Sequence, residues 1–219
     1  MSDPTTDPID HDTGSPSIDV ALRSGIALFN EGYPLAAHEP WEAAWLPLDR
    51  GGDERLLHGL IQVAAATHHA RTGNRSGAIG CAEGALDYLD GLGPEYRGLA
   101  LDPIRSWCRR IATDPTSVGR SDTPSFRVDG VVVGFDDLDL DATLATAPAL
   151  AEAIDVADEA PLESAVALAR EERGTGRTRF AELLIAFLRN ADARPQIVAR
   201  IGDHVDRAER KRRDVDDLF

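Results

Sequence analysis

The sequence predicts a mainly α-helical protein: an antiparallel bundle of about five helices, followed by a smaller, mostly helical unit that opens with a β-hairpin. Apolar residues recur at spacings of three and four through most of residues 17–113. Proline and glycine interrupt that pattern at short intervals, which is typical of short turns between antiparallel helices. Residues 125–135 instead place β-branched residues around Asp129-Gly130, the strongest short signal for a hairpin.

Each helix of the bundle has a start or stop signal of its own. Proline is tolerated at the first position of a helix, Ser, Asp and Asn are good N-caps, and glycine closes helices at their C-terminal ends. The predicted helices run from Ser17 to Gly32, from Pro34 to about Leu46, from an Asp53 cap to Gly73, from an Asn74 cap to Gly91, and from Asp102 to just before Asp114.

The rest of the chain divides into a tail, a linker and a second unit. Residues 1–16 are rich in Asp, Thr, Pro and Ser, so we expect a disordered tail. Residues 114–124 lose the helical pattern and predict a linker. In residues 125–219 the hairpin and an acidic turn over 136–141 precede the helical patterns Leu162–Arg173, Phe180–Leu188 and Ile197–Val205. The arginine-rich end, Arg207 to Arg213, is flanked by acids and predicts a solvated helix face.

Four short motifs in the first unit form a recognisable series. They are the turn Phe29-Asn30-x-Gly32, the helix His38-Glu39-x-x-Glu42-x-x-Trp45, the helix Gly59-Leu60-Ile61-Gln62 and the closing Gly73-Asn74. Over residues 17–113 the sequence resembles the domain-of-unknown-function family 309. That family carries no established activity, so the resemblance implies where a site would lie and not which reaction it would perform.

Acidic residues dominate the charge of the chain. In total, 38 Asp and Glu face 23 Lys and Arg, the formal charge is −15, and Lys211 is the only lysine. Such a surface keeps a protein soluble at high salt, where charge repulsion is strongly screened, and it resembles proteins of halophilic archaea. An acidic partner-binding protein is the alternative, but the acidity spreads along the whole chain. The charge disfavours nucleic acid as a partner, because binding phosphates requires cations.

Cysteine usage and hydropathy indicate a cytoplasmic protein. Cys81 and Cys108 lie inside apolar helical patterns and are expected to be buried free thiols. We expect no signal peptide and no membrane partner, because no apolar run approaches the roughly 18 residues that a membrane span needs.

The candidate site lies where the second and third helices meet. At 100° per residue, His58, Gln62 and His69 share a stripe on the third helix. On the second helix His38, Glu42 and Trp45 share a face, and Glu39 is turned about 100° away. A short turn joins the helices, so they pack antiparallel, with Glu42 level with His58 and His38 level with Gln62. His69 lies about two turns further along.

Several kinds of chemistry fit these residues. His38, Glu42 and His58 would form a metal site suited to Zn, Mn or Fe. Without a metal, Glu39, Glu42 and His58 are candidates for a general acid and base. Trp45, Gln62 and His69 are candidates for binding. In the structural alternative, His38 and Glu42 bond one another or cap neighbouring backbone and hold the helix pair in register.

Pro40 complicates the geometry, because a mid-helix proline removes a hydrogen bond and kinks the backbone. A helix that began at Pro40 would move His38 off the Glu42 face. The sequence therefore predicts a binding or scaffold module with a buried His/Glu cluster between two helices. The alternative is a small metal-dependent or acid–base enzyme, hydrolase-like, using His38, Glu42 and His58. The expected partner is a small molecule or a protein, which includes a second copy of the chain.

Overall fold

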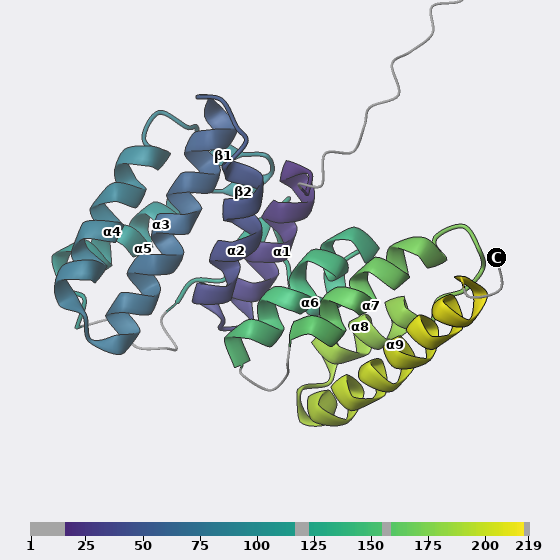
Figure 1. Ribbon diagram of the computed structural model, residues 1–219. Helices are drawn as coiled ribbons and strands as arrows, with labels where there is room; N and C mark the ends of the chain where they lie inside the picture. Colours follow the sequence, from purple (N-terminus) through teal and green to yellow (C-terminus); the bar gives the residue numbers. More distant parts are fainter. Residues whose placement is uncertain (1–15, 117–122, 155–158, 217–219) are drawn as a thin grey trace, which may run out of the picture.

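Helices dominate the structure, which confirms the predicted mainly α fold. The computed structural model describes residues 16–116, 123–154 and 159–216. These residues form nine α-helices: α1 (Ile18–Asn30), α2 (Pro34–Trp45), α3 (Gly52–Thr72), α4 (Arg75–Leu89), α5 (Asp102–Thr113), α6 (Leu140–Ile154), α7 (Glu159–Glu172), α8 (Arg179–Arg189) and α9 (Arg194–Asp216). In space, α1 and α2 lie between α3 to α5 on one side and α6 to α9 on the other (Figure 1).

The limits of the first helices follow the capping signals of the sequence. The Ser17 hydroxyl accepts a hydrogen bond from the Val20 N–H at 3.3 Å and so caps α1. The Asn74 side chain accepts from the Gly77 N–H at 3.1 Å and caps α4. Gly73 closes α3 with a φ of 78°, in the left-handed region that a glycine C-cap adopts. These contacts are local, which is why the sequence predicts them well.

Two short hairpins pair into one antiparallel sheet in the order β1-β2-β3-β4. Its strands are β1 (Glu95–Tyr96), β2 (Leu99–Ala100), β3 (Arg127–Val128) and β4 (Val131–Val132). The second hairpin is the predicted one: Asp129 and Gly130 have φ values of 51° and 77°, as a tight two-residue turn requires. The first hairpin was not predicted, although Arg97 and Gly98 have φ values of 49° and 73° in its turn. Arg-Gly is not among the typical turn pairs.

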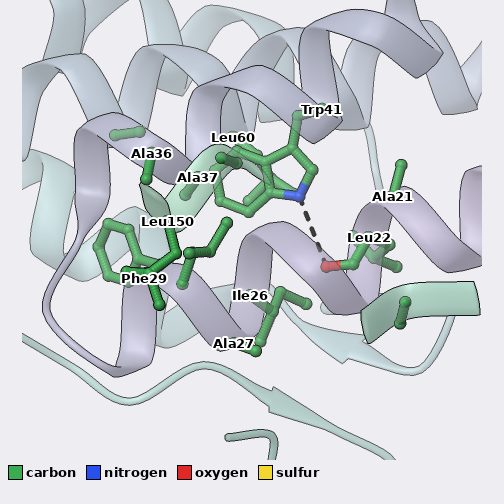
Figure 2. Packing of buried hydrophobic residues seen from close by; sticks show 14 of the residues in the cluster. Ala21, Leu22, Ile26, Ala27, Phe29, Ala36, Ala37, Trp41, Leu60 and Leu150 are labelled. Carbon is green, nitrogen blue, oxygen red and sulfur yellow. Dashed lines mark hydrogen bonds between the residues drawn. The ribbon is translucent and has the colours of Figure 1, made fainter. Parts of the chain in front are cut away.

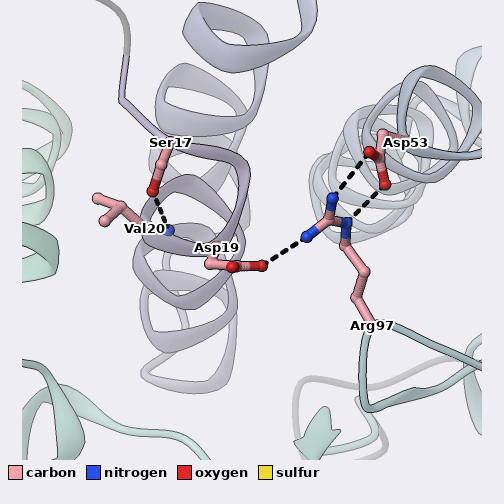
Figure 3. Close-up of polar contacts among 5 residues, drawn as sticks. All are labelled: Ser17, Asp19, Val20, Asp53 and Arg97. Atoms are coloured by element: carbon pink, nitrogen blue, oxygen red, sulfur yellow. Dashed lines mark hydrogen bonds and ion pairs between the residues drawn. The ribbon is translucent and has the colours of Figure 1, made fainter. Parts of the chain in front are cut away.

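Arg97, in the turn of that first hairpin, ties together the starts of α1 and α3 (Figure 3). Its guanidinium donates to both carboxylate oxygens of Asp53, at 2.5 and 2.8 Å, and to Asp19 at 2.7 Å. The prediction that Asp53 caps α3 is wrong: the helix begins at Gly52 with Gly51 as its cap. Asp53 lies in the first turn, where its carboxylate binds Arg97.

Side chains of α1 also hold segments from the second half of the chain. The Ser24 hydroxyl donates to the carbonyl of Ala142 in α6 at 3.1 Å. The Asn30 amide donates to the carbonyls of Phe126 and Val133 at 2.9 and 2.8 Å and accepts from the Phe126 N–H at 2.7 Å. The helix α6, whose sequence is rich in Ala and Thr and includes Pro148, was not among the helical patterns predicted for the second unit. The two predicted units therefore pack together, and their separation into domains stays a prediction.

The core is a continuous cluster of buried apolar side chains centred on α1, α2, α3 and α6 (Figure 2). The Trp41 ring is fully buried, and its indole N–H lies 3.5 Å from the carbonyl of Leu22. Gly25 allows this close approach, because a β-carbon there would lie 2.3 Å from the Trp41 ring. Leu150 of α6 joins the same cluster beside Phe29. The helix that carries the His-Glu motif is thus fixed on its inner face.

Two further expectations concern the ends and surroundings of the chain. Most of the predicted tail, residues 1–15, and the middle of the predicted linker, residues 117–122, lie outside the described residues. Within the described ranges, none of the helices combines the length and apolar character needed to cross a membrane.

Candidate functional site

The first polar pair lies on α2, which runs through Pro40 without a break in the helix. His38 therefore stays on the Glu42 face, and its Nδ1 lies 3.5 Å from the Glu42 carboxylate one turn away. The side chains are 33% and 46% exposed. A pair so open to water within a single helix contributes little to stability. This contact matches the predicted His38–Glu42 bond, but it is half-exposed and does not join two helices.

The second polar pair is more enclosed and does join helices. His58 Nδ1 lies 3.6 Å from the Glu54 carboxylate, and these side chains are only 19% and 18% exposed. Glu54 also accepts a hydrogen bond from the indole N–H of Trp45 at 3.2 Å. The His58 ring stacks on Tyr88 at 3.7 Å between centroids and lies 4.5 Å from the Trp45 ring. We call these four residues the ring cluster.

The ring cluster connects the end of α2, the start of α3 and the end of α4. At 3.6 Å the His58–Glu54 contact is within ion-pair reach but longer than a hydrogen bond, and buried His58 Nδ1 makes no hydrogen bond to the described residues. The contact is an ion pair only when His58 is protonated, whereas the Trp45 N–H fixes the position of the Glu54 carboxylate in either state. This arrangement holds helix ends in register.

The predicted metal-ligand set of His38, Glu42 and His58 is not assembled. His38 and Glu42 face one another, and His58 turns toward Glu54 and the rings on either side of it. Among residues 16–116, 123–154 and 159–216, no three His, Cys, Asp or Glu side chains are grouped so that they could hold a metal ion. Glu54 lies four residues, about one helical turn, before His58 in the same helix. His58 therefore contacts Glu54 and does not reach across to Glu42 of α2.

The other predicted residues of the third helix point to α4. Gln62 is half-buried and lies beside Gly84 of α4. A β-carbon at position 84 would lie 3.5 Å from the Gln62 side-chain oxygen. His69 Nδ1 lies 3.2 Å from the side-chain nitrogen of Asn74, in the turn between α3 and α4. Gln62 and His69 therefore belong to the packing of α3 on α4, and they do not join His58 in one site.

Glu39 lies in a different place, on the wall of a groove between α1, α2, α6 and α7. The groove has a volume of about 800 Å³, and eight of its fourteen lining residues are apolar. From α2 it is lined by Glu39, Pro40 and Ala43, and from α6 by Leu144 and Ala145, among others. At its edge Arg173 forms an ion pair with Asp141. We call it the α2–α6 groove.

The cysteines do not supply a nucleophile. Burial raises the pKa of the Cys108 thiol to about 12, and it also raises the pKa of Cys81. Because the thiolate is the reactive form, burial lowers the reactivity of both thiols, and most strongly that of Cys108. Cys108 is a buried free thiol, as predicted, whereas Cys81 is only partly buried and packs against the core.

Residues 22–81 match the model of the family described as Domain of unknown function (DUF309). This segment of the chain is similar to the DUF309 family. The matched segment runs from α1 into α4 and lies inside the stretch 17–113 in which the sequence resembles that family. A search of curated proteins found no match.

The DUF309 segment supplies most of the polar side chains described above. Trp45, Glu54 and His58 of the ring cluster lie in it, and so does Glu39 of the α2–α6 groove. Tyr88 lies outside it, and no spacing rule points to Tyr88 because it comes from the far end of α4. Glu54 was not predicted as a partner of His58, although its spacing of four from His58 was a usable signal.

Proposed function

We propose that this chain is a binding module whose ring cluster braces the helices and whose α2–α6 groove takes a small, largely apolar molecule. The observation that carries the proposal is the divergence of the three candidate catalytic side chains. Glu39 lines the groove, Glu42 pairs with His38, and His58 faces Glu54. The three side chains therefore lie in three different environments and do not face a common site.

This divergence disfavours an acid–base or metal-dependent reaction at the predicted cluster. A general acid and a general base must both reach one reacting group, at about 3 Å or through a single water. His58 is held between two rings, with its Nδ1 turned inward to Glu54. Glu42 is half-exposed on another helix. The scaffold role therefore accounts better for these histidines and carboxylates.

The groove has the features of a site for a small organic molecule. Such sites measure roughly 300–1,000 Å³ and combine apolar walls with a few polar groups. The α2–α6 groove has about 800 Å³, and its apolar residues come from four helices and the segment before α1. Its charged side chains are Glu39, Asp141, Glu163, Arg170 and Arg173. An apolar molecule with one polar end fits this distribution.

The test is a screen by ligand-observed NMR with a library of small apolar fragments that carry one polar group. We expect hits with the wild-type protein that are lost in Ala43→Trp, because the indole would fill the groove from the α2 side. The matched control is Ala153→Trp, a similarly exposed alanine of α6 that does not line the groove. Circular dichroism checks that both variants keep their helices.

Two outcomes would contradict the proposal. One is a screen without any hit for the folded wild-type protein. The other is a set of hits that Ala43→Trp retains in full, because the fragments would then bind elsewhere on the chain.

A further inference from the structure

A second groove, about 1240 Å³ in volume, is lined by residues of α7, α8 and α9 and of the segment between α7 and α8. These helices lie at the far end of the molecule from α3 to α5 (Figure 1). Its charge is opposite to that of the protein. Six of its side chains are cationic and three are anionic, in a chain whose formal charge is −15. The cations are Arg177, Arg179, Arg200, Arg207, Lys211 and Arg212. We call it the basic groove.

The acids of the basic groove neutralise few of these cations. Glu171 forms an ion pair with Arg212. Glu172 accepts from the backbone N–H of Phe180 at 3.0 Å, and Glu182 accepts from the Thr178 hydroxyl at 2.7 Å. Two of the three carboxylates are thus engaged by uncharged donors.

Four of the six cations have no hydrogen-bond or ion-pair partner for their side chains among the described residues, and a fifth, Arg207, has only long contacts. Arg207 is 3.9 Å from Asp203, and its other nitrogen is 3.5 Å from His204. The side chains of Arg177, Arg179, Arg200 and Lys211 form no hydrogen bond or ion pair with any residue that the structure describes. The protein surface has an excess of carboxylates, so cations spread evenly over it would find acidic partners. Unpaired cations gathered in one groove therefore differ from an ordinary solvated surface.

Three of the cations, Arg179, Arg200 and Arg207, lie near the same side chain, His204. His204 of α9 is half-buried, with its ring edge-on to Phe180 at 6.4 Å. Burial lowers the pKa of His204, and so do the positive charges of Arg207, Arg179 and Arg200. Arg179 belongs to α8, whereas the other two belong to α9. These surroundings favour the neutral form of His204, and the positive charges nearest to it are those of the arginines.

We propose that the basic groove binds a small molecule carrying at least two phosphate groups. Guanidinium groups bind phosphate oxygens in a bidentate fork, and a lysine adds a compact point charge. Four unpaired cations match a ligand with several negative charges. The acidic surface around the groove repels a long polyanion such as nucleic acid, so a compact ligand is favoured.

Lys211 offers a direct probe of the site, because it is the only lysine in the chain. The first measurement is calorimetric titration of the full chain with inorganic pyrophosphate at low salt. We expect binding that falls about tenfold in Arg200→Gln and in Lys211→Gln, a loss of about 1.4 kcal/mol each. The control is Arg213→Gln, which removes the same charge from α9 outside the groove and should change the affinity less than about twofold.

The second measurement follows acetylation of Lys211 by an amine-directed reagent, read from its peptide by mass spectrometry. Pyrophosphate should slow this acetylation, and the tricarboxylate citrate at the same concentration should not. Absence of pyrophosphate binding, equal loss in Arg213→Gln, equal protection by citrate, or tighter binding of a single-stranded oligonucleotide would each overturn the proposal.

Discussion

The two Glu–His pairs of the DUF309 segment provide an internal test of what the polar residues do. Both pairs are spaced by four on a helix, but only Glu54–His58 is enclosed and bonded to a third residue from another helix. Glu54→Ala removes the acceptor of the Trp45 N–H and the partner of His58. Leaving a partly buried donor unpaired costs about 1–2 kcal/mol. Glu42→Ala removes an exposed pair, at a cost of about 0–0.5 kcal/mol.

The assay is urea unfolding followed by circular dichroism, together with thermal melting. For a chain of this size, about 1–2 kcal/mol corresponds to a fall of about 2–8 °C in Tm. Because both variants replace glutamate by alanine in a helix, their change in helix propensity largely cancels in the comparison. Glu54→Gln keeps an acceptor for Trp45 and should lose less, below about 1 kcal/mol.

A bracing role for Glu54 would be refuted if Glu42→Ala lowered the free energy of unfolding as much as Glu54→Ala, or if Glu54→Ala left it unchanged. Metal analysis of protein purified without a histidine tag adds an independent readout. We expect no stoichiometric metal in the wild type or in Glu42→Gln. A stoichiometric Zn, Mn or Fe in the wild type that disappears in Glu42→Gln would show that a metal site forms after all.

Three further predictions concern the rest of the chain. The hydrogen bonds from Arg97 lower the pKa of the Asp53 carboxyl in the folded protein. Their contribution to the free energy of unfolding is therefore fully present above the pKa of the unfolded carboxyl, about 4, and is lost as the pH falls through the lower pKa of the folded state. Arg97→Gln should therefore lose about 1–2 kcal/mol at pH 7 and progressively less below pH of about 4 in urea unfolding; a pH-independent difference would contradict this. Thermal midpoints should rise from low to molar KCl as carboxylate repulsion is screened, and equal midpoints would count against a halophilic surface. Limited proteolysis should cut within residues 1–16 and 114–124, whereas cuts inside either half would place the boundary elsewhere.

The sequence was most informative where structure is decided locally. The cap at Asn74, the helix end at Gly73 and the turn at Asp129-Gly130 depend on residues within three or four positions, and all are present. The hairpin at Arg97-Gly98 was missed, because its turn is held by pairing with β3 and by carboxylates from two distant helices. Contacts of that range leave no periodic signal.

In the candidate site, too, a contact within one helix was predicted and contacts between helices were not. Helical spacing correctly paired His38 with Glu42, since one helix determines that contact. It did not locate the partner of His58, because the approach of α4 and Tyr88 depends on how three helices pack. The α2–α6 groove and the basic groove depend on the placement of α6 to α9, and one-dimensional patterns do not specify that placement.

Mapping of bound fragments by two-dimensional NMR tests the central claim most directly. The amide signals of Glu39, Ala43 and Ala145 should shift on addition of the strongest fragment, while the indole signal of Trp45 stays in place. Such a result would assign binding to the α2–α6 groove and leave the ring cluster as a brace. Shifts confined to the Trp45 indole and to Tyr88, with the groove signals unchanged, would contradict the account.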